Sequence, residues 1–261
     1  MVRAETDFPD RIASVNDDAM RGVFRMCLLR TTQFLCFAFF AGTDKEPAIG
    51  APPPLRTIVY DVSYTISTTS EEKSGAGTAQ RSALTTDRGR LSVDVVAAPQ
   101  DGRLIVDAAF AGYTPDRSPL RIAISKSGDL LAAPATLIST AAAGVLPLLA
   151  RGLLVDRDVS PGSTWDVVVP APLRGTITYR VLHSDDERAV LAVAGLLSVR
   201  RPDGFDSQST ATVAYDTVRL CPLHYDVTTI VRSQPSPSNN RTTTTHLVAD
   251  LVSDSFANLK R

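Results

Sequence analysis

From residue 57 onward, apolar and polar side chains alternate along much of the chain with a period of two. In residues 57–67 every second position is apolar (Ile58, Tyr60, Val62, Tyr64 and Ile66), and Thr, Ser and Asp fill most positions between them. Because successive side chains of a strand point to opposite faces, this pattern predicts a strand with one buried face. Comparable apolar alternation recurs at 91–95, 104–110, 120–124, 177–181, 223–231 and 247–251. The chain is therefore expected to be mainly β.

One apolar stretch, residues 135–152, does not alternate. Its side chains are apolar nearly all round, and Gly144 and Pro147 interrupt it. We expect a helix to about Val145 and a second turn that starts near Pro147, since proline does not continue a helix. A helix that is apolar on all sides is buried on more than one side. Its simplest place is against the open face of a curved sheet.

These elements predict a single β domain over residues 55–261. A first strand series covers 55–133, the helix covers 135–152, and a second strand series covers 160–255. The predicted fold is a curved antiparallel sheet or open half-barrel of about 9–11 strands, with the helical segment buried between the two series. Asp101-Gly102 indicates a tight hairpin. The Ser-, Thr- and Glu-rich residues 68–80 and the Ser/Pro/Asn-rich residues 233–241 are expected to be loops.

The first 54 residues have a different character from the domain. Residues 20–42 carry Arg21, Arg25 and Arg30 and then an apolar run from Phe34 to Gly42. This order of a basic and an apolar region is typical of a signal peptide. Residues 1–19 are expected to be an upstream extension, and 43–54 a Pro-rich linker. We expect export to the periplasm or the outside of the cell, with no membrane span after cleavage; the alternative is an N-terminal membrane anchor.

Charge and cysteine content narrow the classes of partner. The net charge is −1, from 27 basic and 28 acidic residues, and no basic run occurs. Nucleic-acid binding normally leaves a basic patch, so no nucleic-acid partner is expected. Cys221 is the one cysteine outside the N-terminal apolar region. Its neighbours Leu220, Pro222 and Leu223 supply no base, and we expect a packed or turn-side cysteine.

Chemistry-bearing residues are sparse. The sequence lacks a Gly-x-Ser-x-Gly elbow and a phosphate-binding loop, and its three histidines are His183, His224 and His246. We expect no catalytic residues, no metal site and no cofactor, and hence no enzyme. The alternative is a hydrolase, or a two-ligand metal site, built on His224 and Asp226. By spacing these two side chains share the strand face that points away from the core.

The order of elements resembles exported bacterial β proteins of the half-barrel type, of which the LolA/LolB-like carriers of lipoproteins and lipids are the best known. In that group a curved antiparallel sheet is covered by helices and encloses an apolar cavity. Residues 161–165, Pro-Gly-Ser-Thr-Trp, also resemble a Pro-Gly-x-x-Trp entry to a second β half in exported bacterial proteins. The resemblance implies an architecture and transfers no functional residue.

The function expected from these observations is non-catalytic binding. The partner would be either a hydrophobic ligand such as a lipid, or a protein such as a lipoprotein or another envelope protein. The alternative is that this chain is itself a structural or interaction protein of the envelope, without a cavity. If a cavity exists, we expect inward aromatic and aliphatic side chains to line it: Tyr60, Tyr64, Phe110, Ile122, Leu146, Leu149, Tyr179 and Tyr225.

Overall fold

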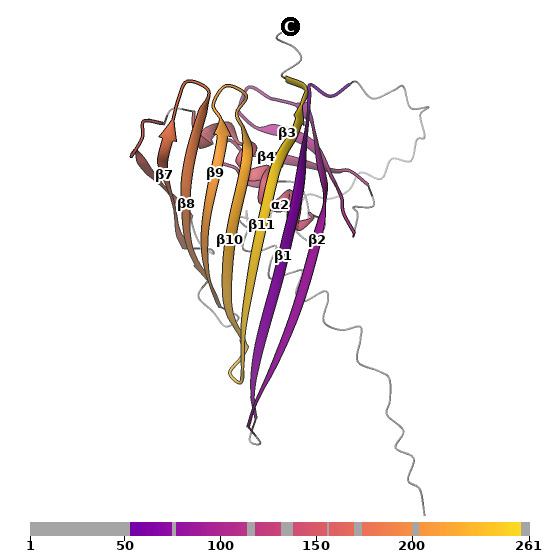
Figure 1. Cartoon of the computed structure of the whole chain (residues 1–261), viewed down its shortest axis with the longest axis vertical. Coiled ribbons are helices and arrows are strands. Elements are labelled where there is room, and N and C mark those ends of the chain that lie inside the picture. The colour runs from indigo at the N-terminus through magenta and orange to yellow at the C-terminus, as the bar shows by residue number, and fades with distance from the viewer. Residues whose placement is uncertain are drawn as a thin grey trace, which may run out of the picture.

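The computed structural model describes residues 53–74, 77–113, 118–131, 138–155, 157–169, 174–199 and 204–256. Within them the strands form one eleven-stranded antiparallel sheet (Figure 1). The strands are β1 (Arg56–Ser74), β2 (Gly77–Ala97), β3 (Leu104–Ala111), β4 (Leu120–Ile124), β5 (Leu130–Leu131), β6 (Thr164–Val169), β7 (Arg174–Ser184), β8 (Arg188–Val199), β9 (Phe205–Asp216), β10 (Cys221–Ser236) and β11 (Asn239–Asp254). Apart from Pro53 and Pro54, the three N-terminal segments predicted above lie outside the described residues.

The sheet consists of two meanders that meet along one seam. Its order is β5-β4-β3-β2-β1-β11-β10-β9-β8-β7-β6. Consecutive strands are therefore neighbours in the sheet except β5 and β6, and the seam is the pairing of β1 with β11. There the first strand pairs with the last, from Ile58 opposite Asp254 to Glu72 opposite Asn239. The sheet is curved and open, with β5 and β6 as its edges. The predicted mainly β fold, with two strand series and one helical segment between them, is confirmed.

The helical segment lies between the two meanders in the chain and packs on one face of the sheet, which we call the inner face. It comprises α2 (Thr140–Val145) and the 3-10 turns η2 (Leu146–Leu149) and η3 (Arg151–Leu153). The α-helix begins at Thr140 because the Ser139 hydroxyl accepts a hydrogen bond from the backbone N–H of Ala142. The α-helix ends at Val145, and Pro147 stands in the following 3-10 turn, as the sequence predicted.

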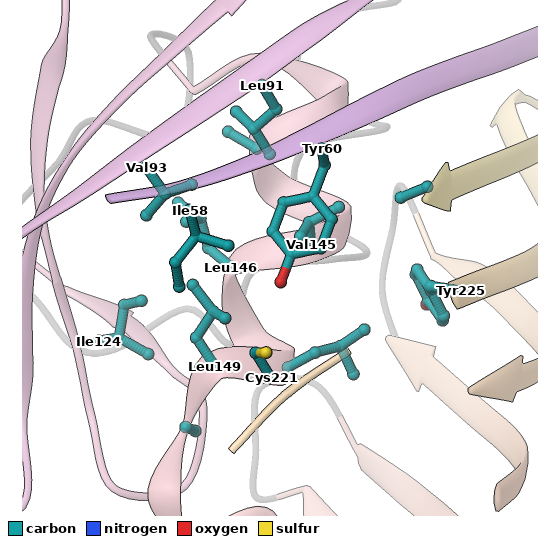
Figure 2. Close-up of a cluster of buried hydrophobic side chains, with 14 of the residues drawn as sticks. Ile58, Tyr60, Leu91, Val93, Ile124, Val145, Leu146, Leu149, Cys221 and Tyr225 are labelled. Atoms are coloured by element: carbon teal, nitrogen blue, oxygen red, sulfur yellow. The ribbon is translucent and has the colours of Figure 1, made fainter. Parts of the chain in front are cut away.

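The main core forms where these turns meet the sheet (Figure 2). Alternate residues of the central strands point inward, and Ile58, Tyr60 and Leu91 are each at most 1% exposed. From the helical side Val145 and Leu146 are fully buried against them. The hydroxyl of Tyr215 on β9 donates a 2.9 Å hydrogen bond to the backbone oxygen of Leu148, which fastens η2 to the second meander.

Two long hairpins extend the centre of the sheet beyond this core, at the narrow end of the molecule in Figure 1. The pairing of β1 with β2 continues to Ser74 opposite Gly77, and that of β10 with β11 to Ser236 opposite Asn239. The loops predicted at 68–80 and 233–241 were therefore wrong in extent. Polar strand ends form here because β1 has a hydrogen-bonding neighbour on both sides, which satisfies its backbone without an apolar face.

Two glycines fit specific backbone requirements. Gly102 has φ +82° in the hairpin between β2 and β3, which confirms the turn predicted from Asp101-Gly102. A Cβ at Gly89 of β2 would overlap the backbone oxygen of Ala111 on β3. The backbones of the two strands therefore leave no room for a side chain at that point.

Candidate binding surface on the inner face of the sheet

The eight side chains predicted to line a cavity all lie on the inner face or on the turns that cover it. Six of them are buried in the main core with at most 7% exposure: Tyr60, Phe110, Ile122, Leu146, Leu149 and Tyr225. Tyr64 and Tyr179 are only partly buried, and they pack at the margin of that core. The structure thus brings all eight into one packed cluster, with these two tyrosines at the edge that faces the hairpin ends.

Beyond that margin the inner face continues toward the hairpin ends. The helix contacts β1, β3 and β11, and a Cβ added at Gly144 would come within 2.9 Å of Leu247 Cδ1. Leu247 pairs with Tyr64 across the seam, so the helix ends its cover near this row. We call the inward-facing residues between this row and the hairpin ends the distal inner face. It carries Val167, Val169, Ile177, Leu197, Val199, Phe205, Ser207, Ser209, Thr229, Val231, Thr243, Thr245, Ile66, Thr68, Ser70, Arg81 and Arg241.

The apolar half of the distal inner face consists of the inward residues of β6, β7 and β8, together with Phe205 of β9 and Val231 of β10. Val169, Phe205 and Val231 form a small buried cluster against which Ile177 and Leu197 are partly buried. At the margin nearest the main core the rings of Trp165 and Tyr179 stack in parallel, with centroids 5.4 Å apart. The guanidinium of Arg157 lies over the Trp165 ring, 6.0 Å from its centroid. Aromatic rings that are stacked and partly exposed offer a large apolar contact area.

The other inward residues of β9 and β10, and most of those on β11 and β1, carry hydroxyl groups. The Ser209 and Thr229 hydroxyls are 3.0 Å apart, and those of Thr68 and Thr243 are 3.2 Å apart. Thr245 is 3% exposed, and its hydroxyl has no hydrogen-bond partner among the described residues. Burying a hydroxyl without a partner costs roughly 1–3 kcal/mol, so this position favours a group that can hydrogen bond to it.

A buried ion pair closes the opposite, covered end of the sheet. Arg56 at the start of β1 donates two hydrogen bonds, of 2.8 and 2.7 Å, to the carboxylate of Asp254 at the end of β11. It donates a third, of 2.8 Å, to the backbone oxygen of Arg219. Burial by itself raises the pKa of Asp254, but the hydrogen bond and charge of Arg56 and the backbone N–H of Phe256 outweigh it, so the pKa lies below its usual value.

Cys221 lies beside this ion pair and is buried, as expected for a packed cysteine. Its sulfur is 3.9 Å from the Asp254 carboxylate. Burial raises the pKa of the thiol to about 11, which leaves it protonated near neutral pH. This site therefore stabilises the junction of β1, β10 and β11 and does not provide a nucleophile.

The histidines of the central strands lie on the outer, solvent-exposed face. His224 and Asp226 share that face, as predicted, but they do not pair with each other. Nδ1 of His224 is 2.6 Å from Asp250, and Nε2 of His246 is 2.9 Å from Asp226. Both contacts cross from β10 to β11. His224 lies directly opposite Asp250, whereas His246 lies opposite Thr228 and reaches Asp226 diagonally. Among the described residues no cluster of three or more His, Cys, Asp or Glu side chains has the geometry of a metal site.

Sequence reasoning missed the two arginines of the distal inner face. Arg241 lies in the predicted loop 233–241, and Arg81 directly follows the predicted loop 68–80. The sequence pattern therefore did not indicate to which face of the sheet either side chain points. The register places Arg81 and Arg241 on either side of Ser70. A signal was present in the sequence, because Thr68, Ser70 and Glu72 continue the spacing of Tyr64 and Ile66 with polar side chains.

Known proteins show little similarity to this chain. No family model matches the sequence, and no curated protein matches it. Among solved structures the chain is similar to lipovitellin, in a study of lipid–protein interactions, with a TM-score of 0.44 and 12% identity. The match covers 78% of this chain and 26% of the lipovitellin chain, and a similarity of this degree supports no conclusion about function. These comparisons give no evidence for the predicted resemblance to LolA/LolB-like carriers.

Proposed function

We propose that this protein is an exported, non-catalytic binding domain that holds a hydrophobic ligand on the distal inner face. The observation that carries the proposal is the apolar surface that continues past the helical cover. Trp165, Tyr179, Ile177 and Leu197 are each only partly buried there. Covering such surface contributes about 25 cal/mol per Å², and contiguous apolar patches mark ligand or protein contact sites.

The curvature of the sheet supports a ligand in preference to a flat protein partner. The apolar side chains come from five consecutive strands and point to one side of a curved surface. Ligand sites are concave, mostly apolar and furnished with a few polar groups. Thr243, which is partly exposed, supplies a polar group along one border. The His–Asp pairs stand on the exposed outer face, where water is not excluded from them.

Replacing Leu197 by asparagine is expected to weaken ligand binding at least about tenfold, or ~1.4 kcal/mol. The reason is that an amide buried against an apolar ligand without a partner costs roughly 1–3 kcal/mol. The matched control is Leu196→Asn, one residue away on β8, whose side chain is 63% exposed on the outer face. The measurements are titration with an apolar fluorescent probe and native mass spectrometry of protein purified without detergent.

Wild-type protein and Leu196→Asn are expected to carry an added mass of several hundred daltons, the size of one lipid, and Leu197→Asn to lose it. A clean apo mass for the wild type together with no probe binding would contradict the proposal. A co-purifying protein in place of a small molecule would instead favour an envelope protein partner. Thermal melts of both variants establish that they remain folded.

Export is proposed from residues 20–42, whose basic and then apolar order supports it. Expression in a bacterial host is expected to give a mature chain that begins after Ala41 or Gly42, as read by intact mass and N-terminal sequencing. Phe37→Arg, which interrupts the apolar run, is expected to abolish processing, and Phe8→Arg is the control outside it. A chain that keeps residues 20–42 and fractionates with the membrane would replace this proposal with an N-terminal anchor.

A further inference from the structure

Two arginines converge on one position of the distal inner face. Ser70 of β1 lies directly opposite Arg81 of β2 on one side and opposite Arg241 of β11 on the other. Residues directly opposite in an antiparallel pair point to the same face. The two arginine Cα atoms are therefore about 10 Å apart, twice the 4.7–4.9 Å spacing of neighbouring strands. Two long guanidinium side chains over that span can reach one small anion between them.

Neither arginine has its charge neutralised within the described part of the chain. No ion pair joins Arg81 or Arg241 to a described carboxylate, and Nε of Arg241 is buried without a hydrogen-bond partner. The nearest acidic residue on the same face is Glu72, at the next inward position toward the hairpin end. A buried donor without a partner is costly, and charged donors more so. This end of the sheet thus favours an anion.

The arginine pair lies at one border of the apolar surface on which we propose that the ligand binds. From Tyr64 to Ser70 the inner face of β1 runs about 20 Å, at 3.4 Å per residue. That is close to the length of an extended acyl chain. Along the same path β11 presents first Thr245, then Thr243 and then Arg241. The apolar cluster of Val169, Phe205 and Val231 lies on the side of β10. Charge, hydroxyls and apolar side chains are therefore arranged as the parts of a lipid are.

We propose that Arg81 and Arg241 bind the phosphate of a phospholipid whose acyl chain lies on the apolar half of the distal inner face. This inference rests on the proposed function and names the class of ligand. A phosphate suits the pair better than a carboxylate. Each guanidinium binds two oxygens in parallel, so two arginines together call for more acceptor oxygens than one carboxylate has. Arginine is the usual choice for this kind of bidentate phosphate recognition.

The test compares three amphiphiles with the same oleoyl chain: lysophosphatidic acid, oleate and monooleoylglycerol. Each displaces an apolar fluorescent probe from the full chain, below its micelle concentration. The wild type is expected to bind lysophosphatidic acid most tightly. Arg81→Gln and Arg241→Gln are each expected to weaken that binding about tenfold and to leave the affinity for monooleoylglycerol unchanged.

The matched control is Arg232→Gln, which removes the same charge from the exposed outer face of β10. It is expected to change neither affinity. Retained monooleoylglycerol binding shows in the same assay that each variant is folded. Equal affinities for all three amphiphiles, or variants that do not discriminate among them, would overturn the phosphate assignment and leave the proposed function standing. If no amphiphile displaces the probe, the proposed function itself fails.

Discussion

Replacing Asp254 by alanine is expected to lower the free energy of unfolding by about 3 kcal/mol, the lower end of the range for breaking a buried ion pair. The Asp254 side chain is 0% exposed and Arg56 retains 17% exposure. Without the carboxylate, Arg56 keeps its charge in a largely desolvated position. The pair joins the first strand to the last, so the loss acts on the seam of the sheet. Urea denaturation followed by circular dichroism measures it.

The control is Asp250→Ala, four residues earlier on β11. Asp250 is 60% exposed and contacts His224 on the outer face. An exposed pair contributes about 0–1 kcal/mol, so this variant is expected to lose little stability. Equal losses for the two variants would show that the Arg56–Asp254 pair does not hold the seam.

The same pair predicts a dependence of stability on pH. The pKa of Asp254 lies below its usual value in the folded chain, so the folded state binds this proton less readily than the unfolded state does. The stabilisation is fully present above the unfolded pKa of about 3.9 and is lost as pH falls through the folded pKa. The difference in unfolding free energy between wild type and Asp254→Asn is expected to be constant above about pH 5 and to shrink in acid. A difference that does not change with pH would contradict the assignment.

The apolar alternation of the sequence predicted the two meanders well, because it reports which face of each strand is buried. It does not report which strand is the neighbour. Thr57 to Ile66 carry the pattern of a half-buried strand whether β1 lies at an edge or at the centre. The pairing of β1 with β11 joins residues that are 167 to 196 positions apart in the chain. That pairing follows from how the two meanders dock on the helical segment, which no local pattern encodes.

The long hairpins show a second limit of the sequence pattern. From Thr68 to Glu72 the inward positions of β1 are polar, so the contrast between the two faces disappears and the segment has the composition of a loop. Paired backbones on both sides hold it extended. The tyrosines of the candidate surface, Tyr64 and Tyr179, were predictable because aromatic residues alternate with polar ones. Arg81 and Arg241 became members of the surface only through the register of three strands.

Replacing Leu146 by alanine is expected to lower the free energy of unfolding by about 2–5 kcal/mol. Leu146 is fully buried where α2 passes into η2, and η2 contacts β10 and β4, which belong to different meanders. A cavity at this point weakens the contact that joins them. The control is Leu196→Ala, whose side chain is 63% exposed on the outer face, and which is expected to lose little stability. Thermal and urea unfolding measure both variants.

The Leu146→Ala variant also distinguishes a ligand bound under the helical segment from one bound on the distal inner face. Leu146 packs in the main core under the helical segment, whereas Leu197 lies on the distal inner face. At temperatures where the variant stays folded, Leu146→Ala is therefore expected to keep the wild-type affinity for an apolar probe although it is less stable. Leu197→Asn is expected to lose affinity with a smaller loss of stability. If Leu146→Ala loses both together, the ligand occupies the space under the helix, and the binding surface must be sought among the buried residues around Leu146 and Leu149 instead.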